Sequence, residues 1–283
     1  MLDGMEGTMN KLSIEKRAQV VGCLVEGMSI RATVRITGAA KNTVTKLVVE
    51  LGAACADYMD KTFRDLPCKR IQCDEIWSFC YSKEKNVPDD HKGELGYGDV
   101  YTWTALDPDT KLVPSFMVGK RTAEYGNAFM LDLASRLKNR VQLTTDGHKV
   151  YLQAVENAFG CEIDYAMLIK IYGGTSAEDE RKYSPAECTG FEVVPITGYP
   201  VENKISTSHV ERQNLTMRMS MRRFTRLTNG FSKKIENHYF ATALYFMYYN
   251  FGRIHKTLRV TPAMEAGVSD HVWTLEEIAG LIA

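Results

Sequence analysis

Three acidic residues in separate motifs are the strongest chemical signal in the sequence. Asp74 lies in the run Gln-Cys-Asp-Glu-Ile-Trp, Asp146 in Thr-Thr-Asp-Gly, and Glu211 in Ser-His-Val-Glu-Arg. Mg²⁺ prefers hard oxygen ligands, so carboxylates that converge from distant parts of a chain can hold a pair of Mg²⁺ ions, with Mn²⁺ as a substitute. Such a pair activates a water or a 3′-hydroxyl and stabilises the leaving oxygen of a phosphodiester. The three residues therefore predict phosphoryl transfer on a nucleic acid.

Each of these carboxylates also has a purely structural interpretation. Asp74 interrupts an apolar strand pattern, where a charge is costly unless it is paired or binds a metal, and the alternative is a salt bridge. Strand side chains alternate between faces, so we expect the adjacent Glu75 to point away and not to act with Asp74 as a pair. Asp146 could instead cap a helix. Glu211 could close a capping box with Ser208. We favour the metal-ligand role for Asp74, Asp146 and Glu211.

A basic segment follows Glu211 without compensating acid. Between residues 212 and 226 there are five arginines and no aspartate or glutamate, whereas a solvated charged helix normally mixes both signs. Arginine makes bidentate contacts with phosphate, so this face is expected to bind a nucleic-acid backbone. His209, two residues before Glu211, is expected to support the metal ligands without contacting the metal itself. The expected DNA contacts of this segment are Arg212, Asn214, Arg218, Arg222, Arg223, Arg226 and Lys233.

The N-terminal segment carries a helix-turn-helix pattern. Residues 13–26 have apolar residues at helical spacing, with Ser13 at the N-cap position, and Ser29 caps a short second helix. A third helix begins near residue 41 after a turn. In a helix-turn-helix this third helix enters the major groove of DNA. The alternative is a three-helix bundle used only for packing. The residues expected to reach DNA are Asn42, Thr43, Thr45 and Lys46.

The middle of the chain alternates between strand and helix patterns. Apolar and β-branched runs predict strands, and helical spacing separates the later ones. This order predicts an α/β fold with a mixed sheet flanked by helices and matches the ribonuclease H-like fold. Residues 173–206 are weakly patterned, which is typical of a loop or a small insertion. The expected strands are 70–81, 100–106, 111–118, 141–145 and 163–171, with helices at 122–137 and 147–159.

Length and composition fit a multi-domain protein. At 283 residues, we expect an all-α helix-turn-helix domain at 1–55, a linker at 56–69, and a catalytic domain with basic C-terminal helices at 70–283. No run of about 18 apolar residues predicts a membrane span. Seven scattered cysteines and no export signal predict reduced thiols and a cytoplasmic location. The net charge is zero, yet the basic residues are concentrated near both ends, as expected for local DNA-binding surfaces.

The acidic motifs and two further runs together resemble a known family. The spacing around Asp74, Asp146 and Glu211 looks like the Asp-Asp-Glu triad of bacterial insertion-sequence transposases. Two later runs, Arg-Arg-Phe-Thr-Arg-Leu-Thr-Asn-Gly-Phe-Ser-Lys at 222–233 and Tyr-Asn-Phe through Thr-Pro-Ala at 249–263, are similar to the same proteins. The closest likeness is to the family of the first-numbered insertion sequence. The resemblance covers about two thirds of the chain, and no single motif carries it alone.

The resemblance implies a transposase. Such an enzyme cleaves DNA at transposon ends with two Mg²⁺ ions held by Asp74, Asp146 and Glu211, and then joins the ends to target DNA. It also implies double-stranded DNA, both terminal inverted repeats and target, as the partner of a homodimer or larger assembly. Two alternatives stay open: a metal-dependent nuclease or resolvase of the same fold without strand transfer, and a non-catalytic DNA-binding regulator derived from a transposase. Some members of the family begin with cysteine-paired zinc fingers, which this chain lacks.

Overall fold

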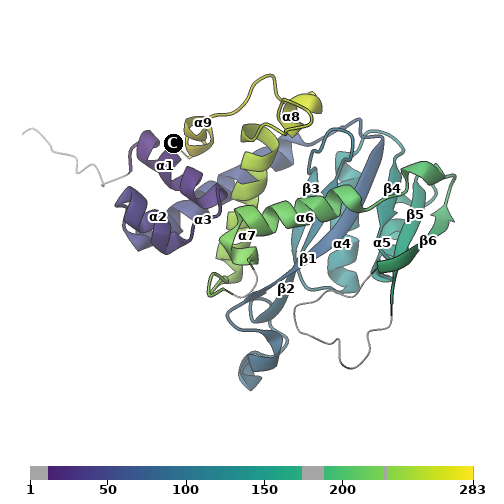
Figure 1. The fold of residues 1–283 in the computed structure, drawn as a ribbon, viewed down its shortest axis with the longest axis horizontal. Coiled ribbons are helices and arrows are strands. Elements are labelled where there is room, and N and C mark those ends of the chain that lie inside the picture. The colour runs from purple at the N-terminus through teal and green to yellow at the C-terminus, as the bar shows by residue number, and fades with distance from the viewer. Residues whose placement is uncertain (1–11, 174–187, 226–227, 283) are drawn as a thin grey trace, which may run out of the picture.

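The N-terminal part of the molecule is helical, as the sequence predicts. The structure, a computed structural model, describes residues 12–173, 188–225 and 228–282 (Figure 1). Its first helices are α1 (Ile14–Val25), α2 (Ile30–Thr37) and α3 (Lys41–Thr62). Ser13 and Ser29 are confirmed as N-caps, because their side chains accept the backbone N–H groups of Lys16 and Ala32. Gly38 ends α2 in the left-handed conformation, at φ 71°, which glycine adopts without strain.

Helix α3 joins the N-terminal helices to the rest of the fold. It runs unbroken past residue 55 and into the expected linker at 56–69. Its neighbour is α7 (Ile235–Met247), and a side chain at Gly52 would collide with the backbone of Phe240, its Cβ lying 2.3 Å from the carbonyl oxygen. A single hydrophobic core contains Leu51 of α3 and Ile71 of the sheet. The division into domains stays a prediction, while the two parts share one core.

The end of the described chain returns to its beginning. Helix α8 (Pro262–Glu265) is followed by α9 (Leu275–Ala279), which packs against α1 (Figure 1). The guanidinium of Arg17 donates to the carbonyl oxygens of Ala279, at 3.3 Å, and Ile282, at 2.5 Å. The first and last helices are therefore fastened to each other.

The described residues form a six-stranded mixed sheet in the order β3-β2-β1-β4-β5-β6. Strands β1, β4 and β5 are parallel, and the remaining neighbours are antiparallel. Helices α4 (Ala123–Arg136) and α5 (Val150–Phe159) cover one face, and α6 (Ser208–Ser220) crosses the other (Figure 1). This confirms the predicted mixed sheet flanked by helices and is compatible with a ribonuclease H-like fold. The strands are β1 (Arg70–Cys80), β2 (Gly98–Leu106), β3 (Ser115–Gly119), β4 (Gln142–Thr145), β5 (Asp164–Tyr172) and β6 (Cys188–Thr197).

Strand β6 lies in the segment that the sequence left without structure. It pairs antiparallel with β5 at the edge of the sheet. Gly190 and Pro195 weaken its strand pattern, and a proline without an N–H is tolerated at an edge, where one side of the strand needs no partner. Residues 174–187 of the same segment lie outside the described residues. Short helical turns are η1 (Glu84–Asn86), η2 (Asp89–His91), η3 (Glu202–Lys204), η4 (Arg222–Phe224) and the π-helical η5 (Tyr248–Gly252).

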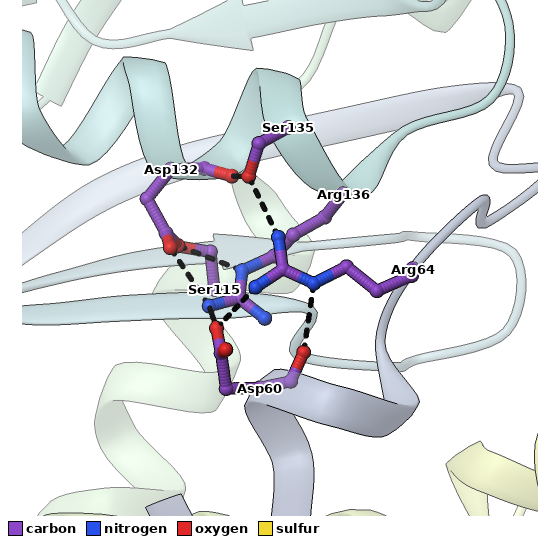
Figure 2. Close-up of polar contacts among 6 residues, drawn as sticks. All are labelled: Asp60, Arg64, Ser115, Asp132, Ser135 and Arg136. Atoms are coloured by element: carbon purple, nitrogen blue, oxygen red, sulfur yellow. Dashed lines mark hydrogen bonds and ion pairs between the residues drawn. The ribbon is translucent and has the colours of Figure 1, made fainter. Parts of the chain in front are cut away.

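A network of ion pairs fastens the end of α3 to α4 and the sheet (Figure 2). Arg136 Nη2 lies 2.8 Å from Asp60 Oδ1 and 2.7 Å from Asp132 Oδ1. Arg64 Nη2 lies 2.6 Å from the same Asp60 oxygen. Two serine hydroxyls complete the network: Ser115 of β3 donates to Asp132, and Ser135 of α4 accepts from Arg64 Nη1. We name this set the junction cluster: Asp60, Arg64, Ser115, Asp132, Ser135 and Arg136.

Two sequence expectations concern the whole chain. None of the helices in the described parts is long and apolar enough to cross a membrane. All seven cysteines are free in the structure, and their reduced state in the cell stays a prediction. Five of them are at least partly buried, among them Cys73 and Cys80 of β1, which therefore act as small core residues.

Candidate metal centre

Parallel pairing of β1 and β4 brings Asp74 and Asp146 together. Cys73 of β1 pairs with Thr145 of β4, so the residues that follow them lie side by side. Asp146 Oδ1 accepts the backbone N–H of His148 at 3.0 Å. The N-cap position of α5 is occupied by Lys149 instead, so the interpretation of Asp146 as a helix cap is wrong. Asp146 stands at the carboxyl end of a strand, where ligands collect in open α/β sheets.

Glu75 joins these two aspartates, contrary to the sequence interpretation. One carboxylate oxygen each from Asp74, Glu75 and Asp146 lies within 4.8 Å of the others. Strand alternation fixes the direction in which each side chain leaves the backbone, and not where its carboxylate ends. The Glu75 N–H donates to Asp74 Oδ1 at 2.9 Å, which draws that carboxylate back along the strand. The expectation that Glu75 could not act with Asp74 is therefore wrong.

The Glu75 carboxylate is buried and only half satisfied. Its side chain is 1% exposed, and Oε2 lies 3.2 Å from Arg121 Nη2. The same Arg121 nitrogen lies 3.6 Å from Asp146 Oδ2, so one guanidinium bridges two carboxylates. Glu75 Oε1 is buried and makes no hydrogen bond of good geometry, and the buried Tyr151 hydroxyl near this carboxylate is unpaired as well. A buried, unpaired carboxylate oxygen is uncommon and indicates a place for a further donor or cation.

Burial and mutual repulsion shift the pKa values of two carboxylates upward. Burial raises the pKa of Asp74 to about 6, and the charges of Asp146 and Glu211 add to this, against the hydrogen bonds that Asp74 accepts. Burial also raises the pKa of Glu75 to about 7; the nearby Tyr151 hydroxyl and Arg121 act in the opposite direction. Negative charge is therefore under-compensated here, and added positive charge would be stabilised.

Glu211 approaches the same site from α6. Its Oε2 lies 2.5 Å from Lys170 Nζ of β5, and its Oε1 accepts the Thr207 hydroxyl at 2.5 Å. Thr207 is the N-cap of α6 and makes no side-chain cap bond, while Ser208 is the first helical residue. The capping-box interpretation of Glu211 is therefore wrong. The carboxylate lies near enough to raise the pKa of Asp74, but outside the group of three oxygens formed by Asp74, Glu75 and Asp146.

Two other residues of α6 have roles that differ from the sequence prediction. Asn214 was expected to contact DNA, but it is 8% exposed and its Nδ2 donates to Asp74 Oδ2 at 2.8 Å. It therefore orients a metal-ligand candidate. His209 was expected to assist Glu211, yet its Nδ1 lies 3.4 Å from Lys111 Nζ. Two helical steps of about 100° place positions 209 and 211 on nearly opposite sides of α6, so His209 does not support the site.

The expected basic contacts in this region do not converge on the acidic group. Arg212, Arg222 and Lys233 are exposed, whereas Arg223 is partly buried. Arg218 donates from Nη1 to the carbonyl oxygen of Phe224 at 3.1 Å, so this side chain stabilises the turn after α6. Arg226 falls outside the described residues. The exposed members remain candidates for phosphate contacts.

The residues expected to read DNA lie in the first turns of α3. Asn42 and Lys46 are exposed, and Thr43 and Thr45 are partly exposed. Lys46 Nζ lies 3.5 Å from Glu50 of the same helix, a surface pair of little energetic weight. The Thr45 hydroxyl donates to the Lys41 carbonyl oxygen at 3.1 Å. These side chains are therefore accessible from solvent, as a contact with DNA requires.

The sequence named Asp74, Asp146 and Glu211 but missed Glu75, Arg121 and Lys170. The donor set consists of carboxylate oxygens, one of them buried and unpartnered, and this chemistry fits a hard divalent cation such as Mg²⁺ or Mn²⁺. The arginine and the lysine come from the β3–α4 loop and from β5, where no local pattern marks them as partners of the acids. No protein-family model matches the chain, and no curated protein matches it either.

Proposed function

We propose that this chain is a DDE-type DNA transposase with a ribonuclease H-like catalytic domain. The observation that carries the proposal is the approach of Asp74 and Asp146 from neighbouring parallel strands, with Glu211 facing the same carboxylates from α6. These are the three residues on which the resemblance to insertion-sequence transposases rests. Cleavage at transposon ends and strand transfer into target DNA are the activities that we infer.

Asp74, Asp146 and Glu211 would hold two Mg²⁺ ions, and Glu75 is a further candidate ligand. When bound, the metal pair would supply activation of the attacking oxygen and stabilisation of the leaving 3′-oxygen. Asn214 fixes the orientation of Asp74 through its hydrogen bond. Lys170 holds the Glu211 carboxylate in place and would have to share or release it as the site fills. No serine or tyrosine nucleophile is assigned.

DNA contacts in the proposal come from two parts of the molecule. Helices α1–α3 act as the helix-turn-helix that reads terminal repeats, through Asn42, Thr43 and the exposed lysine at position 46. Arg212, Arg222 and Lys233 neutralise backbone phosphates. Because two transposon ends must be brought to one target, the proposal includes a homodimer or larger assembly on DNA. It also places the enzyme in the cytoplasm, where free thiols persist.

Cleavage and strand transfer of a duplex that carries the flanking inverted repeats test the proposal. Native protein and Glu211→Gln are compared with Mg²⁺, Mn²⁺ or EDTA, and Glu236→Gln, an exposed glutamate of α7, serves as the matched control. We expect metal-dependent joined products with native protein and the control, and none with Glu211→Gln. Cleavage without joining would favour a nuclease or resolvase. Binding without cleavage in any metal would favour a non-catalytic regulator.

A further inference from the structure

A basic groove lies between the N-terminal helices and the segment that follows α6. Its volume is about 730 Å³, and its walls come from α1, α2 and the start of α3 on one side and from η4 and α7 on the other. It is separate from the acidic residues of the candidate metal centre, none of which lines it. The start of α3, expected to read DNA, therefore faces a wall of the same molecule across this space.

The charge of this groove is entirely positive. Among its described lining residues five are basic and none is acidic. None of the five forms an ion pair with a described carboxylate, and one, Lys233, lies 4.0 Å from the ring centre of Phe231. Five uncompensated cations around one groove repel each other unless an anion lies between them. The basic residues are Arg31, Lys41, Arg222, Arg223 and Lys233.

Arg223 is held in the groove by a chain of buried polar groups. Its Nη1 donates to the Ser232 hydroxyl at 2.8 Å, and that oxygen lies 2.9 Å from His238 Nδ1. The other ring nitrogen of His238 lies 3.3 Å from the hydroxyl of Ser78 on β1. Ser232 and His238 are buried. Burial lowers the pKa of Arg223 to about 10, so the guanidinium stays charged at neutral pH while it lacks a carboxylate partner.

We propose that this groove binds the phosphate backbone of duplex DNA at a fixed distance from the candidate metal centre. The inference deepens the proposed function and rests on it. Strand β1 connects the two places, because Asp74 belongs to the acidic group and Cys80 pairs with Ser232, which lies between the groove residues Phe231 and Lys233. Six residues of strand at about 3.3 Å each give a separation of roughly 20 Å. That span corresponds to roughly six base pairs at 3.4 Å each.

Duplex DNA is the occupant that fits these features. Arginine and lysine side chains on both walls can bind the phosphates of a backbone that runs along the groove, and Asn229 and Asn237 add neutral donors. An acidic peptide or an anionic membrane would also meet a positive surface. Neither explains why the groove joins the start of a helix-turn-helix to the catalytic strand. An anionic membrane becomes an outcome of the test.

The test compares two triple variants of the full chain that lose the same charge. The groove variant is Arg31→Ala, Lys41→Ala and Lys233→Ala. The control is Arg35→Ala, Lys138→Ala and Lys234→Ala, three exposed basic residues outside the groove. We expect the slope of log binding constant against log salt to become less steep by about two to three units in the groove variant. The control slope should stay within about half a unit of native.

Phosphate-ethylation interference on a terminal-repeat duplex gives the second measurement. We expect ethylation of phosphates about six base pairs from the cleavage position to interfere with binding of the native protein and the control variant, but not of the groove variant. Equal slope changes in both triples, or a native slope in the groove variant, would overturn the groove while leaving DNA binding and the proposed function in place. Native protein that binds no duplex at low salt would overturn both. If the groove variant loses binding to vesicles with anionic lipid but binds duplex DNA as the native protein does, a membrane would replace DNA as the occupant.

Discussion

The junction cluster and the candidate metal centre both bring carboxylates together with basic side chains, but their charges balance differently. The junction cluster has two aspartates and two arginines, joined by contacts of 2.6 to 2.8 Å. Although burial acts to raise it, the hydrogen bond from Arg64 and the charge of Arg136 hold the pKa of Asp60 below its ordinary value. Every charged side chain in this cluster has an oppositely charged partner in contact. The cluster therefore fastens α3 to α4 and needs no further cation to balance its charge.

The candidate metal centre has four carboxylates and two basic partners. Arg121 and Lys170 compensate part of the charge, and Glu75 Oε1 has no hydrogen-bond partner. The pKa values of Asp74 and Glu75 rise, where that of Asp60 falls. The sign of the pKa shift and the presence of an unsatisfied oxygen therefore distinguish the candidate metal centre from the junction cluster.

The largest expected effect is the loss of cleavage in Asp146→Asn. This change keeps the size of the side chain but removes a ligand charge from the carboxylate group, so cleavage should fall below detection while DNA binding stays nearly native. The matched change Asp132→Asn, in the junction cluster, should leave the cleavage rate of folded protein unchanged. Gel-based cleavage and binding assays on the same preparations measure both. Retained cleavage would remove Asp146 from the metal site.

The second prediction concerns the balanced cluster. Arg136→Ala removes the 10% exposed arginine that Asp60 and Asp132 share. Because Asp60 keeps Arg64 and both aspartates reach solvent, the fold should be destabilised by about 2 kcal/mol. The melting temperature should fall by roughly 4 to 8 °C. Lys61→Ala removes an exposed ion pair with Asp57 in the same helix and should cost less than about 1 kcal/mol. Similar melting temperatures for the two variants would show that the junction cluster contributes no more than a surface pair.

In the third prediction, loss of a charged side chain stabilises the fold, whereas in the second it destabilises the fold. The pKa of Glu75 lies near 7 in the folded protein, above its ordinary value of 4.5. The folded state therefore binds more protons in that interval, and stability falls as pH rises from about 4.5 to 7. Glu75→Gln removes this loss, so at pH 8 without metal the variant should be more stable than native by roughly 1 to 3 kcal/mol.

Urea unfolding at pH 4.5 and pH 8 in EDTA measures this effect. The advantage of Glu75→Gln should be small at the lower pH, and added Mg²⁺ should stabilise the native protein more than the variant. Asp60→Asn is the contrasting control, because its pKa is lowered and its charge is stabilising at pH 8. A destabilised Glu75→Gln at pH 8 would mean that the ion pair with Arg121 outweighs the cost of burial. The carboxylate charges would then stabilise the fold in both clusters.

The smallest expected effect is that of His209→Ala. The ring contacts Lys111 on the far side of α6 from Glu211, so metal-dependent cleavage should stay within about threefold of native, an energy change below about 1 kcal/mol. Asn214→Ala, which removes the hydrogen bond to Asp74, should cost about ten- to a hundredfold in metal affinity. Metal affinity is measured for both variants. An equal loss of metal affinity would mean that His209 also supports the metal centre.

Local signals predicted most of the elements. Ser13 and Ser29 marked two helix starts because a cap acts within three residues, and alternation found β1 because its pattern repeats along the strand. Strand β6 was missed because Gly190 and Pro195 break the pattern and its position at an edge removes the need for one. Boundaries that depend on tertiary packing, such as the unbroken course of α3, were not visible either.

The candidate site divides in the same way. Asp74 and Asp146 could be recognised because a charge in an apolar strand and an aspartate after a strand are local anomalies. Arg121 and Lys170 come from a loop and a strand about 25 to 50 residues away along the chain from the acids nearest to them, and only folding brings them close. Glu75 was misjudged because alternation was applied to the whole side chain rather than to its first bond.

The packing of α9 against α1 has a consequence for how the protein folds during synthesis. The Arg17 contact with Ala279 joins positions 262 residues apart. At a synthesis rate of 5 to 20 residues per second, the N-terminal helices wait roughly 13 to 50 seconds before their last neighbour leaves the ribosome. In a nascent chain the first helices are therefore exposed long before α9 can pack against α1. Ribosome-bound intermediates would expose the α1 surface to chaperones, and a shortened product would never close it.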